Sequence, residues 1–134
     1  MENWRGITGT IEQFARPDDV VVVAATRPDA FHYYYDGSAP VGCPFDALPS
    51  TVLKQPDVIR QFEQQVQRIV SNRHGRVWLA VRIGRQTGDS RPLVTEALRQ
   101  QYPHATIIYE RQFDDRLFVY GYDLSPRRTQ LQPL

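Results

Sequence analysis

Residues 20–25 read Val-Val-Val-Val-Ala-Ala, a continuous apolar run in which β-branched side chains dominate. β-branched residues favour extended backbone, and a strand that is apolar at every position suits a sheet that is covered on both faces, as parallel sheets are. The run therefore predicts a buried strand. Residues 76–83 contain a second run of this kind, Val77-Trp78-Leu79-Ala80-Val81, and predict a second buried strand.

Amphipathic helices are predicted on either side of these strands. Apolar residues recur at helical spacing in residues 4–15, in residues 56–72 and in a segment that begins after Ser90. Pro28 suits the first turn of a short helix over residues 28–35. Gly75 is expected to end the helix predicted over residues 56–72 by adopting the left-handed conformation.

The remaining apolar segments complete an α/β fold. Alternating patterns predict strands at 104–113 and 117–124, joined by a tight turn at Asp114-Asp115, and a short edge strand is expected near Val41. The predicted fold is a three-layer, Rossmann-like α/β sandwich whose mostly parallel sheet has four to five strands and ends in a C-terminal antiparallel hairpin. Residues 1–124 form a single α/β domain, and residues 125–134, which lack periodicity, are expected to be a disordered tail.

Composition excludes several functional classes. The chain has 134 residues, 16 Lys and Arg against 15 Asp and Glu, and a net charge of +1, which argues against a nucleic-acid binder that relies on bulk positive charge. No apolar run reaches membrane-spanning length, and the first residues lack the layout of a signal peptide. The one cysteine, Cys43, rules out an internal disulfide and a multi-cysteine zinc site.

Two turns that follow the buried strands are candidate sites for an anion. The first, at Thr26 and Arg27, lacks the glycines of a dinucleotide-binding turn, and the proline that follows removes an amide donor. The second, over residues 84–90, offers glycines, Arg85 and a helix start at Ser90. Its plainer interpretation is a strand-to-helix connection that Ser90 caps. Thr26, Arg27, Arg85 and Ser90 are the predicted ligand-binding residues, converging at the C-terminal ends of the strands.

No catalytic residue, cofactor or metal site is predicted. Asp18 and Asp19 precede a strand, whereas a receiver-type acidic pocket needs its acids after one, so a helix-breaking turn is the simpler interpretation. The three histidines are far apart in the sequence and lack metal-ligand spacing. Cys43 with His32 is a conceivable nucleophile and base pair, but its surroundings lack a nucleophile-positioning turn, which favours an inert thiol.

The short helix over residues 28–35 is unusually aromatic, since Phe31 is followed by Tyr33, Tyr34 and Tyr35. Four rings in five positions cover nearly all sides of a helix, so some of them must point outward. The three tyrosines are a candidate interaction surface for a sugar or a partner protein. The alternative is that two rings belong to the core and two cover the sheet edge.

Taken together, these segments resemble the C-terminal extracytoplasmic domain of bacterial polytopic membrane glycosyltransferases of the family-39, or dolichyl-phosphate-mannose mannosyltransferase-like, group. In that group a D-W-R-x-x-x-x-x-I helix leads to P-x-D-x-V-V, then to an aromatic helix with Y-Y and later to an R-x-W-L-V strand. The matching segments here are Trp4-Arg5-Gly6, Ile11, Arg16 to Val23, Phe31 to Tyr35, Arg76 to Val81 and Phe118 to Tyr122.

The resemblance implies a non-catalytic accessory domain on the extracytoplasmic face of a bacterial membrane. Its partners would be the transmembrane part of a parent glycosyltransferase and, nearby, a lipid-linked sugar; the catalytic acids would lie in that transmembrane part, and the domain is either part of a longer chain or freestanding. Two alternatives stay open. One is a small Rossmann-like domain, cytoplasmic in that case, that binds an anionic metabolite or nucleotide, and the other is a self-associating interaction module.

Overall fold

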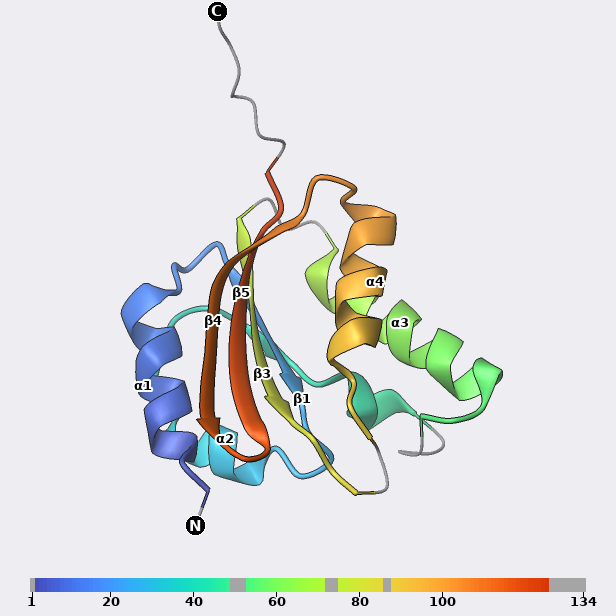
Figure 1. Ribbon diagram of the computed structural model, residues 1–134. Helices are drawn as coiled ribbons and strands as arrows, with labels where there is room; N and C mark the ends of the chain where they lie inside the picture. Colours follow the sequence, from blue (N-terminus) through green and yellow to red (C-terminus); the bar gives the residue numbers. More distant parts are fainter. Residues whose placement is uncertain (1, 49–52, 72–74, 86–87, 126–134) are drawn as a thin grey trace, which may run out of the picture.

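The apolar run Val20–Ala24 forms β1, which lies second in a five-stranded mixed sheet (Figure 1). The structure, a computed structural model, describes residues 2–48, 53–71, 75–85 and 88–125. Among these residues, no helix combines the length and the apolar character that crossing a membrane requires. The elements are α1 (Trp4–Phe14), β1, α2 (Asp29–Tyr34), β2 (Val41–Gly42), the 3₁₀-helix η1 (Pro44–Ala47), α3 (Pro56–Val70), β3 (Arg76–Arg82), α4 (Arg91–Gln101), β4 (Thr106–Asp114) and β5 (Leu117–Asp123).

The sheet combines parallel and antiparallel pairing. Its strand order is β2-β1-β3-β5-β4, in which β1 runs parallel to both of its neighbours and β5 runs antiparallel to both of its own. The predicted C-terminal hairpin and the predicted edge strand at Val41 are confirmed, and the sheet has five strands. It is mixed because β5 inserts between β3 and β4. The expected tail falls almost wholly on residues 126–134, which lie outside the described residues.

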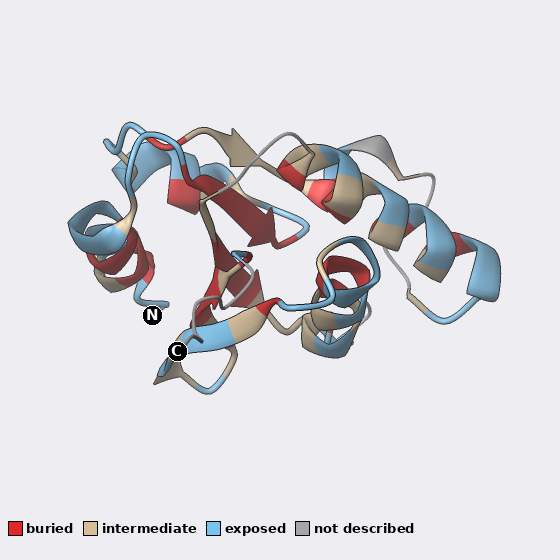
Figure 2. Cartoon of the chain, turned by 90° about the horizontal axis from the view of Figure 1, so that it is seen from above, coloured by how far each residue is buried: buried red, intermediate tan, exposed pale blue. Residues whose placement is uncertain are grey.

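Helices cover both faces of the sheet, and β1 shows why its sequence is apolar at every position. Val20, Val22 and Ala24 belong to a core that α3 and α4 complete. Val21 and Val23 point the other way, into a core that α1 and α2 complete. Because successive side chains of a strand alternate between faces, a strand between two cores has no position for a polar residue. Figure 2 shows the buried residues concentrated in the strands and on the inward sides of the helices.

The start of α1 and the end of α3 show features that the sequence pattern did not predict. α1 begins after Asn3, whose side-chain Oδ1 accepts the Gly6 backbone N–H at 2.9 Å, an N-cap that the apolar spacing did not identify. α3 ends at Val70 rather than near residue 72, and the Ser71 hydroxyl donates to the Gln67 carbonyl at 2.7 Å. The predicted left-handed cap at Gly75 is wrong, because Gly88 is the one glycine among the described residues with a positive φ.

A buried carboxylate, that of Asp19, ties the start of β1 to the start of β3. Asp19 is 1% exposed and accepts hydrogen bonds from the backbone N–H of Arg16 at 2.9 Å and of Arg76 at 2.8 Å. It also accepts the indole N–H of Trp78 at 3.1 Å, and the Arg76 Nε lies 3.4 Å from it. A Cβ atom at Gly75 would lie 2.5 Å from the Asp19 carboxylate, so the glycine is needed for this close approach. The turn predicted at Asp18-Asp19 is therefore also an anchor.

The outer strand β4 is irregular along its length. Its register against β5 shifts between Ile107 and Tyr109 and again between Gln112 and Asp114. Each shift inserts an extra residue, which bends an edge strand and breaks the regular spacing of its hydrogen-bonding groups. Ile107 and Ile108 are exposed on this strand at 43% and 42%.

We predict that Asp19→Asn lowers the free energy of unfolding by about 3 kcal/mol, because it removes a buried charge from its partners and turns an amide N–H₂ toward N–H donors. Urea denaturation followed by Trp fluorescence measures the change. Asp18→Asn, at the exposed neighbouring position, is the matched control and is expected to change stability by less than about 0.5 kcal/mol. Equal effects of the two substitutions would contradict the anchoring role of Asp19.

Candidate functional site

A cavity of about 360 Å³ lies at the C-terminal ends of β1 and β3, which are parallel neighbours. The chain continues from β1 into α2 on one face of the sheet and from β3 into α4 on the other face. Connections that diverge in this way leave a crevice between the two strands, and open α/β sheets bind their ligands there. We name this space the switch cavity, and its lining residues are Glu2, Trp4, Thr26, Arg27, Asp29, Ala30 and Arg82.

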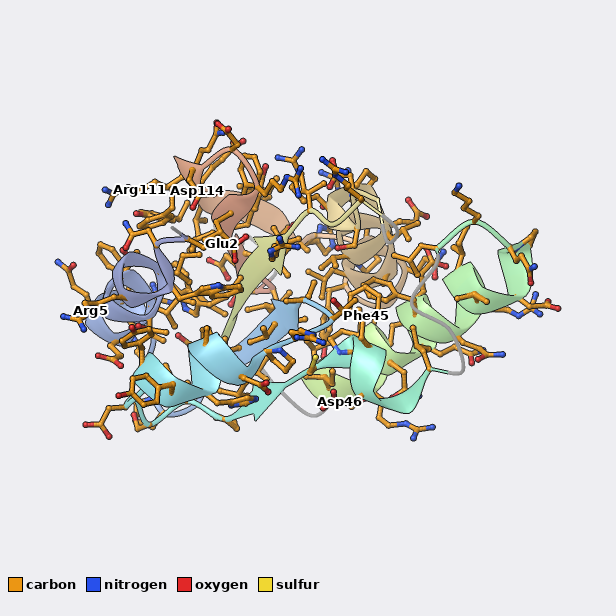
Figure 3. The ribbon with its side chains drawn as sticks, turned by 90° about the horizontal axis from the view of Figure 1, so that it is seen from below. Glu2, Arg5, Phe45, Asp46, Arg111 and Asp114 are labelled. Atoms are coloured by element: carbon orange, nitrogen blue, oxygen red, sulfur yellow. The ribbon has the colours of Figure 1, made fainter. Side chains whose placement is uncertain are left out.

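An ion pair joins two of the residues that line the switch cavity. Arg82, the last residue of β3, donates from Nε to the Glu2 carboxylate at 2.6 Å, and the indole N–H of Trp4 donates to the other oxygen of that carboxylate at 3.2 Å. The Arg82 and Glu2 side chains are 33% and 36% exposed, so water screens their attraction and the pair contributes about 1 kcal/mol or less. Figure 3, viewed from the side of the cavity, shows Glu2 near Asp114 of β4.

The predicted residues Thr26 and Arg27 lie in the switch cavity, directly after β1. Both are exposed, and among the described carboxylates none forms an ion pair with Arg27. Asp29 follows at the start of α2. The lining therefore carries two guanidinium groups and two carboxylates, so that its charges balance while Glu2 is in place.

Arg85, which was predicted to join them, lines a different cavity. This second cavity, of about 250 Å³, lies between the start of α3 and the start of α4, and Lys54 and Asp89 also contribute to it. Asp89 and Arg91 form a close ion pair, with Arg91 Nη2 2.7 Å from the Asp89 carboxylate, and hydrogen bonding from Arg91 lowers the pKa of Asp89. Residues 86 and 87 of the predicted loop lie outside the described residues.

Ser90, the fourth predicted residue, occupies the N-cap position of α4 but is buried, and its side chain makes no capping hydrogen bond. The cap comes from Asp89 instead, whose carboxylate accepts the backbone N–H of Arg91 at 3.0 Å. The structure thus places Thr26 and Arg27 together in one cavity, Arg85 in another and Ser90 under the surface. Whether any of them binds a ligand stays a prediction.

The aromatic helix α2 divides its rings between the core and the surface. Phe31 is fully buried, and Tyr35 stacks on it with 5.1 Å between ring centroids and donates to the Ala39 carbonyl at 2.8 Å. Burial, with a smaller contribution from the nearby Glu12 carboxylate, raises the pKa of Tyr35. Phe31 and Tyr35 are therefore the two rings of this aromatic segment that pack into the core.

Tyr33 and Tyr34 form the outward half of this helix, and we name them the Tyr33–Tyr34 patch. Tyr33 is 81% exposed and Tyr34 37% exposed, and their rings meet edge to face with centroids 4.9 Å apart. The Arg5 guanidinium of α1 lies 5.1 Å from the centre of the Tyr34 ring. Exposed aromatic rings with a neighbouring cation are typical of surfaces that bind a partner.

Among the residues that the structure describes, the remaining reactive groups do not gather into a site. Across the described part of the chain, no group of three or more His, Cys, Asp or Glu side chains is placed to hold a metal ion. His32 and His104 are exposed, and His74 lies outside the described residues. The Cys43 thiol is partly buried and lies 3.5 Å from the Ala25 carbonyl. Burial, and secondarily the Asp46 carboxylate, raises the pKa of Cys43 to about 11.

Sequence reasoning missed Glu2 and Arg82 as residues of the switch cavity. Arg82 carried a usable signal, because it ends a buried parallel strand just as Thr26 and Arg27 follow one, and ligand sites form at such ends. Glu2 carried no local signal, since its partner Arg82 lies 80 residues away in the sequence.

We predict that Cys43 reacts with iodoacetamide at pH 8 about 100-fold more slowly in the folded chain than in urea, because the thiolate reacts and a pKa of about 11 leaves little of it at that pH. The rate in the folded chain should keep rising with pH up to about 11. Mass spectrometry of quenched samples gives both rates. Comparable rates in the two states would contradict an inert thiol.

A scan against models of protein families and searches of curated proteins and of solved structures find no match to this chain. The resemblance to membrane glycosyltransferase domains therefore stays a prediction that rests on the sequence segments quoted above.

Proposed function

We propose that this chain is a non-catalytic accessory domain of a membrane-bound glycosyltransferase that uses a lipid-linked sugar. The supporting observation is where the segments that carry the resemblance lie. Trp4, Ile11, Phe31 and Trp78 come from four separate segments, and all four side chains belong to the one core between the sheet and the pair α1 and α2. Residues that act together as a scaffold are typical of a shared fold rather than of a shared active site.

We also infer that the domain belongs to the Rossmann-like, three-layer class. Support comes from the two cores on opposite faces of β1 and from the diverging connections that leave β1 and β3. The mixed pairing of β5 departs from a fully parallel sheet, so the likeness concerns the half of the sheet built from β2, β1 and β3.

In this proposal the domain packs against the transmembrane part of the enzyme on the extracytoplasmic face and shapes access of the acceptor to the lipid-linked sugar. The Tyr33–Tyr34 patch is the contact surface that the geometry favours. Its two exposed rings bury apolar area on docking, while their hydroxyl groups keep hydrogen-bonding partners. The loop over residues 84–90 is the alternative contact surface, in which Arg85, Gly88 and Asp89 are exposed.

A photocrosslinking experiment tests this proposal. Benzoylphenylalanine at position 33 of the full chain, added to membrane vesicles of the source organism, is expected to give adducts with a polytopic membrane protein. The same group at exposed position 64 on α3, on the opposite face, is the control and should give none. Adducts that are equal at both positions would contradict the docking surface, and turnover of a polyprenyl-phosphate sugar by the purified chain would contradict a non-catalytic role.

A different observation, the switch cavity, favours a second function. Arg27 and Arg82 reach this cavity from the ends of two parallel strands, where open α/β sheets bind small anions. We propose on this basis that the domain binds an anionic metabolite or nucleotide there. This function is compatible with an accessory role, because a soluble binding domain can serve a neighbouring enzyme.

A thermal-shift experiment with ADP and glucose 1-phosphate tests the second function. A ligand that binds only the folded state raises Tm, by about 3–8 °C at a large excess over Kd for a domain of this size. Arg27→Ala should abolish the rise, whereas Arg85→Ala, in the second cavity, should preserve it. Loss of the rise only in Arg85→Ala would move the site to the second cavity, and no rise with either compound would overturn the second function.

A further inference from the structure

The Glu2 residue lines two cavities. One is the switch cavity, and the other is a space of about 360 Å³ lined by Glu2, Asp114, Asp115 and Arg116. The backbone around Glu2 is held in place, because the N–H of Asn3 donates to the Asp114 carboxylate at 3.3 Å and α1 begins at Trp4. Glu2 thus borders both spaces, and the backbone next to it is tied to β4.

The groups that hold the Glu2 carboxylate are those that would hold an anionic ligand. Arg82 Nε and Trp4 Nε1 each donate to one of its oxygens, at 2.6 Å and 3.2 Å. Trp4 is only 5% exposed and is packed into the core between α1 and the sheet, so its N–H is aimed by the fold rather than by the carboxylate. A guanidinium and a fixed indole N–H that converge on one carboxylate form an oxyanion receptor.

Displacing Glu2 changes the charge of the switch cavity. With Glu2 in place, Arg27 and Arg82 are balanced by Glu2 and Asp29, and a phosphate gains little from entering. With Glu2 turned away, the two guanidinium groups face one carboxylate and the cavity favours an anion. Because both members of the Glu2–Arg82 pair are about one-third exposed and solvated, breaking this ion pair costs about 1 kcal/mol or less.

We propose that Glu2 is an internal competitor for this receptor, and that the phosphate group of a small hydroxylated phosphomonoester replaces its carboxylate on Arg82 and Trp4. The Thr26 hydroxyl and the Asp29 carboxylate, which also line the cavity, then receive the hydroxyl groups of the ligand. This inference rests on the second proposed function, binding of an anionic metabolite at the switch cavity, and it names both the ligand class and the group that limits its affinity.

The two tryptophans of the chain provide the readout for a test. The indole N–H of Trp4 donates to Glu2, and that of Trp78 donates to the buried Asp19, so each gives one indole signal in a ¹H–¹⁵N NMR spectrum. We expect titration of the Glu2→Ala chain with glucose 1-phosphate to move the Trp4 signal and to leave the Trp78 signal unchanged. The fitted Kd should be about three- to fivefold lower than that of the wild-type chain, as expected when a competing pair worth about 1 kcal/mol is removed.

Further titrations serve as controls for this experiment. Arg82→Gln in the Glu2→Ala background should raise Kd at least tenfold. Glu96→Gln, which removes one negative charge from α4, should leave the wild-type Kd unchanged. Inorganic phosphate should move the Trp4 signal more weakly than glucose 1-phosphate, and glucose should not move it. Glu2→Gln, which keeps the size of the side chain, should also bind more tightly than wild type, so the result does not depend on the Glu2→Ala variant alone.

The outcomes distinguish a failure of the competition by Glu2 from a failure of anion binding at the switch cavity. Equal Kd values for wild type and Glu2→Ala, both weakened by Arg27→Ala, would overturn the competition while the binding function stands. Tighter binding that Glu96→Gln reproduces, or that survives Arg82→Gln, would likewise overturn it. No movement of the Trp4 signal in any variant would overturn both proposals.

Discussion

The buried carboxylate of Asp19 is the interaction on which the arrangement of the sheet depends. It receives hydrogen bonds from the turn after α1, from the first residue of β3 and from the ring of Trp78 in the core. A buried charge is stable only when it is fully partnered, so the turn after α1 and the start of β3 must meet in one geometry for the chain to fold. That geometry sets β1 beside β3, and the divergence of the chain beyond these two strands produces the switch cavity at their far ends.

Periodicity in the sequence predicted most of the fold for a physical reason: β1, β3 and the helices each follow a pattern of buried and exposed residues that is local in the chain. Long-range polar contacts leave no such pattern. Asp19 meets Arg76 and Trp78 across 57 and 59 residues, and Glu2 meets Arg82 across 80. The site was accordingly predictable only in part. Thr26 and Arg27 were found because they follow a buried strand, whereas Arg85 and Ser90 were grouped with them by a loop whose path the sequence does not specify.

The structure also separates two kinds of aromatic residue that look alike in the sequence. Trp78 lies opposite Gly121, and a Cβ atom at that glycine would come within 2.7 Å of its ring, so the sheet itself makes room for the indole. Tyr33 has no such accommodation and projects into solvent. The scaffold role that we infer for the segments of the resemblance follows from the first kind, and the docking role from the second.

The irregular pairing of β4 affects the tendency of the domain to aggregate. A long outer strand with exposed isoleucines invites the strands of other molecules to add to it, which is how fibrils grow. The extra residues near Ile108 and Phe113 put the outward amide and carbonyl groups out of step with a straight incoming strand. Concentrated solutions of this domain are therefore expected to resist aggregation by strand addition, although β4 is an edge strand of the sheet.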